Sequence, residues 1–200
     1  RFDLKVKFDF LRPEQAWVLG GSAAAADDLS VLWAREVPGD FHARFSALSR
    51  TYRYRILNRR IRPALERHRS CWIRRPVDAA AMHEAAQCLL GEHDFSAFRS
   101  ADCQSSTPVR RITAVAVRRD GMRVEIEVSA NAFLHHMVRN IAGTLLAVGV
   151  GDRPVAWVAE VLAGRDRTVA GPTAVARGLY FAGVEYAARY GLPSVPTSFR

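Results

Sequence analysis

The sequence predicts an α+β fold, with a central, mostly antiparallel sheet and helices packed against it. Residues 112–119 and 122–130 alternate apolar and polar side chains around Asp120-Gly121, which is a strong hairpin signal. Residues 131–149 follow directly and carry apolar side chains at helical spacing. The whole chain reads as strands, helix, hairpin, helix, helix and strand, and this order is typical of an α+β fold.

The first forty residues predict two strands, a helix and a turn. Residues 1–8 alternate as a half-buried strand, residues 11–20 have helical character, and residues 29–37 are strand-like. The small residues of segment 20–28 predict a flexible loop, and Pro-Gly-Asp at 38–40 predicts a turn.

Residues 51–56 alternate strictly and predict a strand with two different faces. Tyr52, Tyr54 and Ile56 lie on one face, and Thr51, Arg53 and Arg55 lie on the other. Aromatic rings beside guanidinium groups suit base stacking and phosphate contact. The commoner alternative is a sheet strand with its aromatic side chains in the core and its arginines in solvent.

The later elements follow from caps and periodicity. Residues 76–90 predict a helix with Asp78 as its N-cap, and residues 91–108 are irregular. A second helix is predicted at 154–164 and a last strand at 178–186.

The helix predicted at 131–149 has unusual polar residues. On a helix, His135 and Arg139 would share one face, while His136 and Asn140 would share another. Two readings stay open from spacing alone. The helix could be basic and partly buried, with imidazoles bonded to backbone carbonyls, or it could carry a functional site.

Composition points to an anionic partner. The formal net charge is +9 and the isoelectric point is near 10.3. The basic residues are arginine except for Lys5 and Lys7. Arginine suits phosphate and base contacts and so favours nucleic acid, although an arginine-rich codon bias would produce the same usage.

Compartment and membrane association are bounded by the same composition. No apolar run reaches the roughly 18–20 residues that span a bilayer, so no membrane partner is expected. No signal segment is evident, and the three cysteines show no C-x-x-C spacing. We therefore expect a reducing, cytoplasmic location and no disulfide framework.

Familiar catalytic motifs do not occur. The sequence has no Gly-rich phosphate loop, no G-x-S-x-G and no H-E-x-x-H. The adjacent His135 and His136 would point to different helix faces and chelate one metal poorly, so we expect no metal site. The remaining arginines, tyrosines and histidines indicate an RNA-reading surface or an active site that lacks a member.

Several long blocks resemble the tRNA pseudouridine synthase A family. The blocks are F-H-A-R-F-S-A at 41–47, T-Y-R-Y-R-I at 51–56, A-A-Q-C-L-L-G-E-H-D-F-S-A-F-R at 85–99, N-A-F-L-H-H-M-V-R-N at 131–140, L-A-G-R-D-R-T at 162–168 and G-L-Y-F at 178–181. The resemblance runs from about residue 11 to residue 193. It implies a pseudouridine synthase fold, isomerisation of uridine in the anticodon stem-loop of tRNA, no cofactor, and a homodimer.

The resemblance also implies a mechanism and roles for particular residues. An aspartate attacks the flipped nucleoside, the glycosidic bond breaks, the uracil turns, and C5 joins C1′. Tyr52 resembles the tyrosine that stacks on the base, Arg139 resembles the cation that pairs with the aspartate, and Leu179 resembles the apolar residue beside the base. We expect RNA contacts from a further set of residues: Arg44, Arg53, Arg55, Arg110, His135 and His136.

One departure from the family is decisive for activity. The family's aspartate lies in a G-R-T-D-A-G-V-H loop, and this motif is absent from the 200 residues. Residues 1–9 resemble the strand before that loop, whereas the chain from Leu11 resembles the segment after it. We therefore interpret residues 1–37 as a remnant of an N-terminal half and residues 38–200 as the C-terminal, catalytic-fold half. The alternative function is an RNA-binding module without activity.

Overall fold

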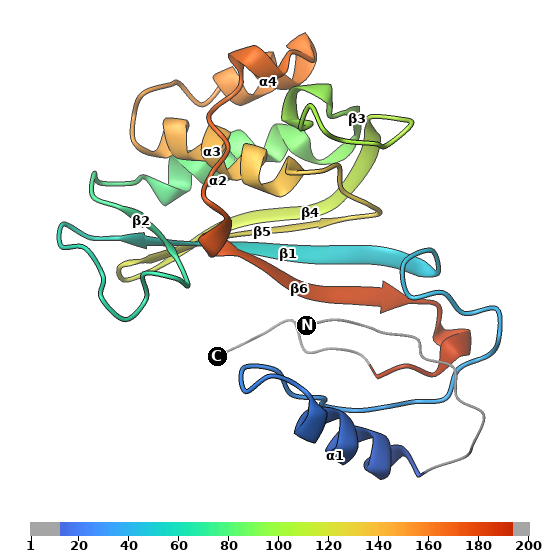
Figure 1. The fold of residues 1–200 in the computed structure, drawn as a ribbon. Helices are drawn as coiled ribbons and strands as arrows, with labels where there is room; N and C mark the ends of the chain where they lie inside the picture. Colours follow the sequence, from blue (N-terminus) through green and yellow to red (C-terminus); the bar gives the residue numbers. More distant parts are fainter. Residues whose placement is uncertain (1–12, 194–200) are drawn as a thin grey trace. The chain divides into compact units, whose positions relative to one another are not determined.

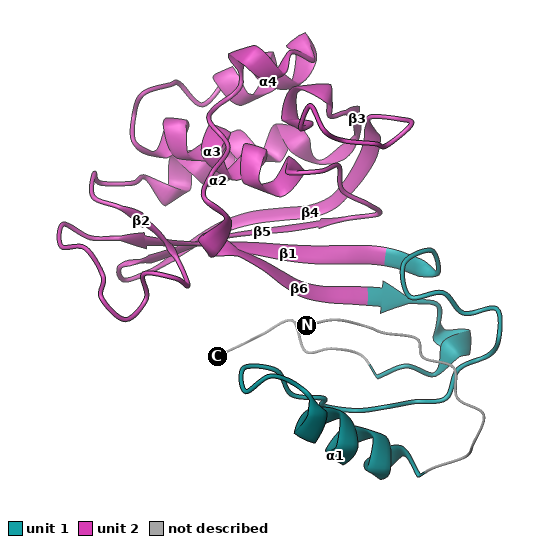
Figure 2. Ribbon diagram, viewed as in Figure 1, with its two compact units in different colours: residues 1–48, 185–200 teal, residues 49–184 magenta. Residues whose placement is uncertain are grey.

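The computed structural model describes residues 13–193, so the strand predicted at 1–8 lies outside the described residues. Figure 1 shows the fold, and Figure 2 shows the two compact units into which the chain divides. The first comprises residues 1–48 and 185–200, and the second comprises residues 49–184. The boundary predicted at residue 37 stays a prediction.

A six-stranded sheet lies mostly within the second unit, and its strand order is β2-β1-β5-β4-β3, with β6 also paired to β1. The strands are β1 (Ala47–Asn58), β2 (Cys71–Ile73), β3 (Gly91–Asp94), β4 (Val109–Asp120), β5 (Arg123–Ala130) and β6 (Leu179–Tyr186). The β1–β5, β4–β5 and β3–β4 pairs are antiparallel, and β1–β2 is parallel. The α+β fold with a mostly antiparallel sheet is confirmed.

Three helices cover one face of this sheet, as Figure 1 shows. They are α2 (Ala79–Ala86), α3 (Met137–Gly149) and α4 (Trp157–Gly164). In the predicted hairpin, Val124, Ile126 and Val128 are buried on this face, as expected. The core between the layers also contains Tyr54 and Ile141, both fully buried. Burial of such large apolar side chains is the main favourable contribution to folding.

The cap predicted for α2 is present. The Asp78 carboxylate accepts hydrogen bonds from the backbone N–H groups of Ala80 and Ala81, at 2.9 and 3.0 Å. The helix ends earlier than predicted, at Ala86, and a 3₁₀ turn (η1, Gln87–Leu89) follows it. Leu90 follows this turn with an extended backbone, and its side chain is exposed.

The start of α3 was predicted six residues too early. Residues 131–136 are not helical. Their polar groups form hydrogen bonds other than those of a helix. The Asn131 carboxamide accepts from the N–H groups of Arg111 and Ala132, and His135 N–H points to Cys103 Sγ. His136 then has a left-handed backbone, with φ of 61°, and α3 begins after it.

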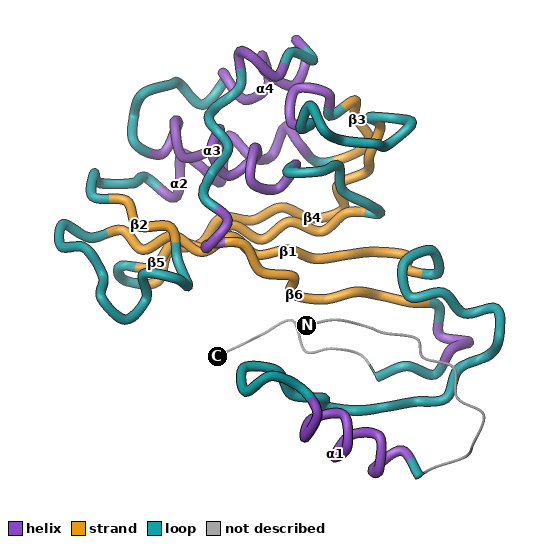
Figure 3. Tube along the Cα trace, viewed as in Figure 1, coloured by secondary structure: helices purple, strands orange, loops and turns teal. Residues whose placement is uncertain are grey.

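Three further predictions of local structure were wrong, two of them in the first unit. Helix α1 (Glu14–Ala24) continues into the segment 20–28 that was predicted as a loop, and ends at Ala24. Its small residues allow close packing, since a Cβ at Gly21 would lie 3.0 Å from Val31 Cγ2. Residues 29–37 form no strand, and none of the described strands pairs with them (Figure 3). The third is the irregular segment predicted at 91–108, which contains the short strand β3.

No helix within residues 13–193 is long and apolar enough to cross a membrane.

The hairpin turn lies one residue later than predicted. Asp120 pairs with Arg123, so the loop residues are Gly121 and Met122. Gly121 has φ of +54°, which glycine adopts without steric cost.

Residues 170–178 form a segment that we call the strap. Its backbone packs directly against the backbone of α3. A Cβ at Gly143 would lie 1.7 Å from the Pro172 carbonyl oxygen, and a Cβ at Gly171 would lie 2.6 Å from Thr144 Cα. Only glycine allows the two backbones to approach so closely. The strap therefore depends on Gly143 and Gly171 for its position.

We predict that Gly143→Ala lowers the free energy of unfolding by about 1–3 kcal/mol, because the new methyl group displaces the strap backbone. Thermal and urea unfolding would measure the change. Gly164→Ala is the matched control, since its Cβ would meet nothing within 4 Å. Equal stability of the two variants would contradict the close approach.

Candidate functional site

Arg139 lies in the first turn of α3 and is held by the strap. Its Nε donates to the Ala174 carbonyl at 2.7 Å, and its own carbonyl accepts from Ala174 N–H at 3.1 Å. The side chain is half-buried. Among the described residues, no hydrogen bond or ion pair engages its two terminal amino groups. The guanidinium is therefore oriented by a neutral group and can still accept an anion.

Asn140, the next residue, anchors the strap inside the protein. Its side chain is fully buried, and its Nδ2 donates to the Phe98 carbonyl at 2.7 Å. Its Oδ1 accepts from Thr173 Oγ1 at 2.6 Å and from Arg167 Nη2 at 3.2 Å. Leaving a buried amide without partners costs about 1–3 kcal/mol, so this network strongly favours one strap position.

Thr144 adds a second anchor one turn along α3. Its hydroxyl donates to the Asn140 carbonyl at 2.8 Å and accepts from Gly171 N–H at 3.1 Å. Arg167 Nη1 also donates to the Gly171 carbonyl, at 2.9 Å. The strap is thus bonded to α3 on both sides of the contact with Gly143.

Tyr54 fixes the other end of the strap. Its ring is fully buried, and its hydroxyl donates to the Val175 carbonyl at 2.7 Å. Burial raises the pKa of this hydroxyl, although the nearby Arg139 and Arg177 guanidiniums oppose the rise. Tyr54 therefore stays a neutral donor. A Cβ at Gly178 would lie 2.9 Å from the tyrosine Cζ, so the chain passes directly over the ring.

Leu179 follows Gly178 and begins β6, where its side chain is half-buried against the core. The structure therefore relates two of the predicted site residues, since the strap that binds Arg139 leads into Leu179. The third, Tyr52, lies on β1, two residues before Tyr54. Both tyrosines lie on the sheet face that carries Val128 and Ile126, which are their respective cross-strand partners.

Tyr52 belongs to an aromatic cluster. Its ring meets Phe133 edge to face, with centroids 5.0 Å apart, and meets Phe181 at 5.3 Å. Burial raises the pKa of the Tyr52 hydroxyl, and Arg50 opposes the rise. The cluster is a neutral aromatic surface, which suits contact with a nucleobase. Sequence reasoning missed Phe133 and Phe181, although both lie inside the motifs quoted above.

The sequence predicted that His135 and His136 point to different helix faces, and this prediction was wrong. Their rings stack with centroids 4.0 Å apart, because both precede α3 and His136 has a left-handed backbone. His135 is exposed and His136 is half-buried. Burial lowers the pKa of His136, the neighbouring His135 and Arg139 lower it further, and Asp102 opposes them. Their proposed contact with RNA stays a prediction.

Arg53 and Arg55 lie on the sheet face opposite the helices, where each meets a glutamate of β5. Arg53 Nε is 2.6 Å from Glu127, and Arg55 Nε is 3.2 Å from Glu125. Arg53 is only 7% exposed, and the Arg55 guanidinium also lies 4.6 Å from the ring centre of Tyr180. Neither sequence alternative described this paired arrangement, and RNA contact by these residues stays a prediction.

Arg110 and Arg44 are placed differently. Arg110 is buried, donates to the carbonyls of Thr107 and Val109, and has an Nε with no hydrogen-bond partner among the described residues. Arg44 belongs to the first unit, where its guanidinium lies 5.6 Å from the ring centre of Phe45. Their roles in RNA binding also stay predictions. Within residues 13–193, no three His, Cys, Asp or Glu side chains gather as metal ligands.

Comparisons with known proteins decide the family. A family model described as tRNA pseudouridine synthase matches residues 85–187. A protein of Xylella fastidiosa (strain M23) named tRNA pseudouridine synthase A is 58% identical over 182 residues, which are 91% of this chain and 71% of that protein. A protein of Xanthomonas euvesicatoria pv. vesicatoria (strain 85-10), also named tRNA pseudouridine synthase A, is 56% identical over 189 residues. These are 94% of this chain and 74% of the Xanthomonas protein.

The chain belongs to the tRNA pseudouridine synthase family. The resemblance drawn from the sequence motifs is thereby confirmed. The region matched by the tRNA pseudouridine synthase model contains α3, the strap and β6, and so includes Arg139 and Leu179. Tyr52 lies before that region, on β1.

We predict that His136 titrates below its ordinary pKa of 6.5 in the folded protein. Because protonation then favours the unfolded state, His136 contributes stability above pH 6.5 that is lost as pH falls through its folded pKa. Proton NMR of the imidazole would measure the pKa directly. Arg139→Gln should raise it part of the way and Asp102→Asn should lower it, and unchanged values in both variants would contradict the assigned neighbours.

Proposed function

We propose that this protein is a tRNA pseudouridine synthase that isomerises uridine in the anticodon stem-loop. Membership of the family and the names of the two relatives support the reaction and the tRNA substrate. The net charge of +9 suits a polyanionic substrate. The observation that carries the proposal is Arg139, a guanidinium fixed by a backbone carbonyl with its terminal amino groups available.

The reaction rearranges the substrate without adding or removing atoms. The bond between C1′ and N1 of uridine breaks, the base turns, and a bond forms between C1′ and C5, with the C5 proton released to water and one taken up at N1. No oxidant or reductant is needed, which agrees with the expectation of no cofactor. What the protein must supply is a carboxylate nucleophile, a surface for the flipped base, and exclusion of water.

Arg139 is suited to position that carboxylate. Since Nε is bonded to Ala174, the plane of the guanidinium is fixed and its two terminal amino groups can bind both oxygens of a carboxylate. A half-buried cation also keeps a nearby carboxylate ionised and therefore nucleophilic. Among the described residues, no carboxylate pairs with Arg139. We propose that the aspartate of a G-R-T-D loop, a motif that the 200 residues do not contain, is its partner.

The aromatic cluster is suited to receive the base. Tyr52 would stack on the flipped uracil, with Phe133 and Phe181 supporting the orientation of its ring. Leu179 would border the base from the start of β6. Stacking of this kind contributes about 1–3 kcal/mol and offsets part of the energy required to unstack the nucleotide.

A second function is an RNA-binding module without catalysis, and the absent G-R-T-D motif favours it. The two functions differ in the release of tritium from tRNA that contains 5-tritiated uridine. Release by the full-length gene product supports the synthase. Retained tRNA affinity without release supports the binding module, and an affinity that does not depend on salt would exclude both. A homodimer and a cytoplasmic location complete the proposal and rest on the family resemblance.

We predict that Arg139→Ala in the full-length protein lowers turnover by about 10²–10³-fold or more, because the carboxylate loses its fixed cation. Affinity for tRNA should change only a few-fold, and thermal unfolding would show whether the strap is still bound. Arg139→Lys keeps the charge without the planar pair of donors and should give an intermediate rate. Wild-type turnover in Arg139→Ala would remove this residue from the site.

We predict that Tyr52→Ala lowers kcat/KM by about 5- to 150-fold, corresponding to about 1–3 kcal/mol of lost stacking. Tyr52→Phe keeps the ring and should lose much less. Tritium-release kinetics on both variants would measure the difference. If the two substitutions reduce the rate equally, the hydroxyl is what matters and stacking is not the role of Tyr52.

A further inference from the structure

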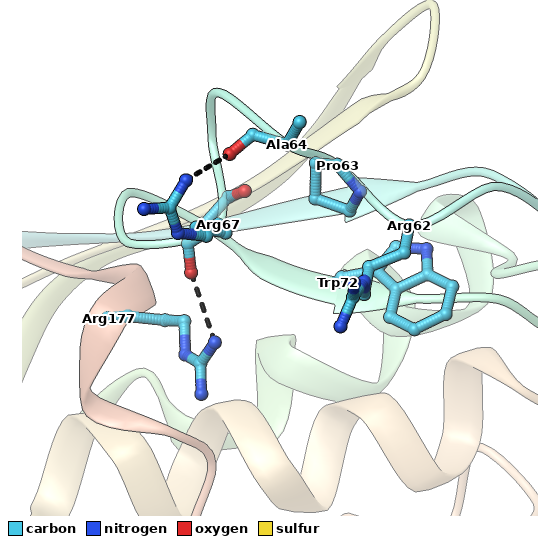
Figure 4. Close-up of a pocket in the computed structure, with 7 residues that line it drawn as sticks. Arg62, Pro63, Ala64, Arg67, Trp72 and Arg177 are labelled. Atoms are coloured by element: carbon cyan, nitrogen blue, oxygen red, sulfur yellow. Dashed lines mark hydrogen bonds between the residues drawn. The ribbon is translucent and has the colours of Figure 1, made fainter.

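A cavity of about 560 Å³ lies at the edge of the sheet in the second unit, and Figure 4 shows its lining. Its walls come from the loop between β1 and β2, from β2 and from the strap. The lining residues are Arg62, Pro63, Ala64, Arg67, Ser70, Trp72 and Arg177. This volume falls in the range of small-ligand sites.

The charge of the cavity is strongly unbalanced. Three of its seven lining residues are arginines, and the described residues that line it include no carboxylate. A second cavity nearby, of about 500 Å³, shows the contrast, because there Arg59 and Arg123 are accompanied by Glu66 and Asp120. Arg123 forms a 2.9 Å ion pair with Glu66. Only the first cavity therefore presents uncompensated positive charge and is suited to an anion.

Two of the three guanidiniums are held in place by neutral groups. Arg67 donates to the Ala64 carbonyl at 3.1 Å and to His68 Nε2 at 2.9 Å. Arg177 donates to the Arg67 carbonyl at 3.0 Å, as the dashed lines in Figure 4 show. Arg62 is the third arginine that lines the cavity. Because neutral acceptors do not cancel the charge, the arginines are oriented without being neutralised.

The cavity also has apolar lining residues, Trp72 and Pro63, which form its apolar wall. Trp72 is half-buried on β2, and its indole N–H donates to the Arg59 carbonyl at 2.8 Å, which fixes the ring. Pro63, which lines the same cavity, is buried. A fixed indole beside guanidiniums is a favourable surface for a heterocyclic base attached to a phosphate. An inorganic anion would leave this wall unused.

The cavity is joined to the candidate site through the strap. Arg177 belongs to the 3₁₀ turn η4 (Ala176–Gly178), which directly precedes Leu179. Val175 and Gly178, on either side, contact the buried Tyr54. A ligand in the cavity is therefore a near neighbour of a base at Leu179, rather than an occupant of a remote surface.

We propose that this cavity binds a second nucleotide of the substrate RNA, with its base against Trp72 and Pro63 and its phosphate at Arg62, Arg67 and Arg177. The inference rests on the proposed function and extends it from the target uridine to a flanking nucleotide. A nucleotide within an RNA chain fits better than a free one, because all three arginines are exposed at the cavity rim, where the chain can continue in both directions.

The test uses the full-length protein and compares Arg62→Gln/Arg67→Gln and Arg177→Gln with Arg75→Gln. Arg75 is the matched control, since it is exposed and already paired with Asp152 at 2.9 Å. The cavity variants should weaken tRNA affinity, raise KM, and reduce the slope of log Kd against log salt by about 1 for each lost phosphate contact. The control should keep the wild-type slope. Cavity variants that match Arg75→Gln would overturn the proposal.

The aromatic half of the cavity has its own test. Trp72→Phe keeps a ring and should bind tRNA better than Trp72→Leu, which keeps bulk but no aromatic face. Circular dichroism and thermal unfolding would confirm that both variants are folded. Equal affinity of the two variants for tRNA would overturn the base contact, since only stacking distinguishes them.

Three further outcomes separate this proposal from its alternatives. If uridine monophosphate binds in the cavity with an affinity that Arg177→Gln removes, and it does not compete with tRNA, then the ligand is a free nucleotide and the RNA assignment is wrong. If the wild-type full-length protein neither binds nor modifies tRNA, the proposed function itself fails. Normal tRNA turnover in the wild type together with unaffected cavity variants overturns only the cavity proposal.

Discussion

The contact between α3 and the strap is the constraint on which the rest of the candidate site depends. Backbones can meet at this distance only because Gly143 and Gly171 have no side chains. A close contact of this kind excludes water, so the polar groups around it must bond to one another. Asn140 and Thr144 satisfy this requirement, and the bonds that they form hold the strap at one height along the helix.

The partner of each arginine determines whether its charge is available to an anionic ligand. The net charge of +9 is therefore not equally available at every arginine. Arg53 and Arg55 meet glutamates, so their charges are largely compensated within the sheet. Arg139 and Arg177 are held by backbone carbonyls and keep their charge available. Arg110 is also held by carbonyls, but it is buried, so its charge is less accessible than the charges of Arg139 and Arg177.

The sequence predicted the elements that depend on local periodicity. The hairpin, the Asp78 cap and the last strand were all found, because alternation and capping are encoded in neighbouring residues. The start of α3 was missed because the backbone N–H of Arg111 and the sulfur of Cys103, both distant in sequence, decide where residues 131–136 bond. Ion pairing of Arg53 was likewise invisible, since it depends on the register between β1 and β5. The strap could not be predicted, because it has no periodicity of its own.

The strap also links the two binding positions that we propose. Ala174 bonds Arg139, Val175 bonds Tyr54, and Arg177 bonds the loop that lines the cavity. Ala174 and Arg177 are three residues apart, which limits their Cα separation to about 11 Å. Nucleotides close together in one RNA chain could therefore occupy both positions. Because the strap is bonded at each point, the spacing between the two positions is built into the folded protein before RNA binds, which reduces the entropy lost on binding.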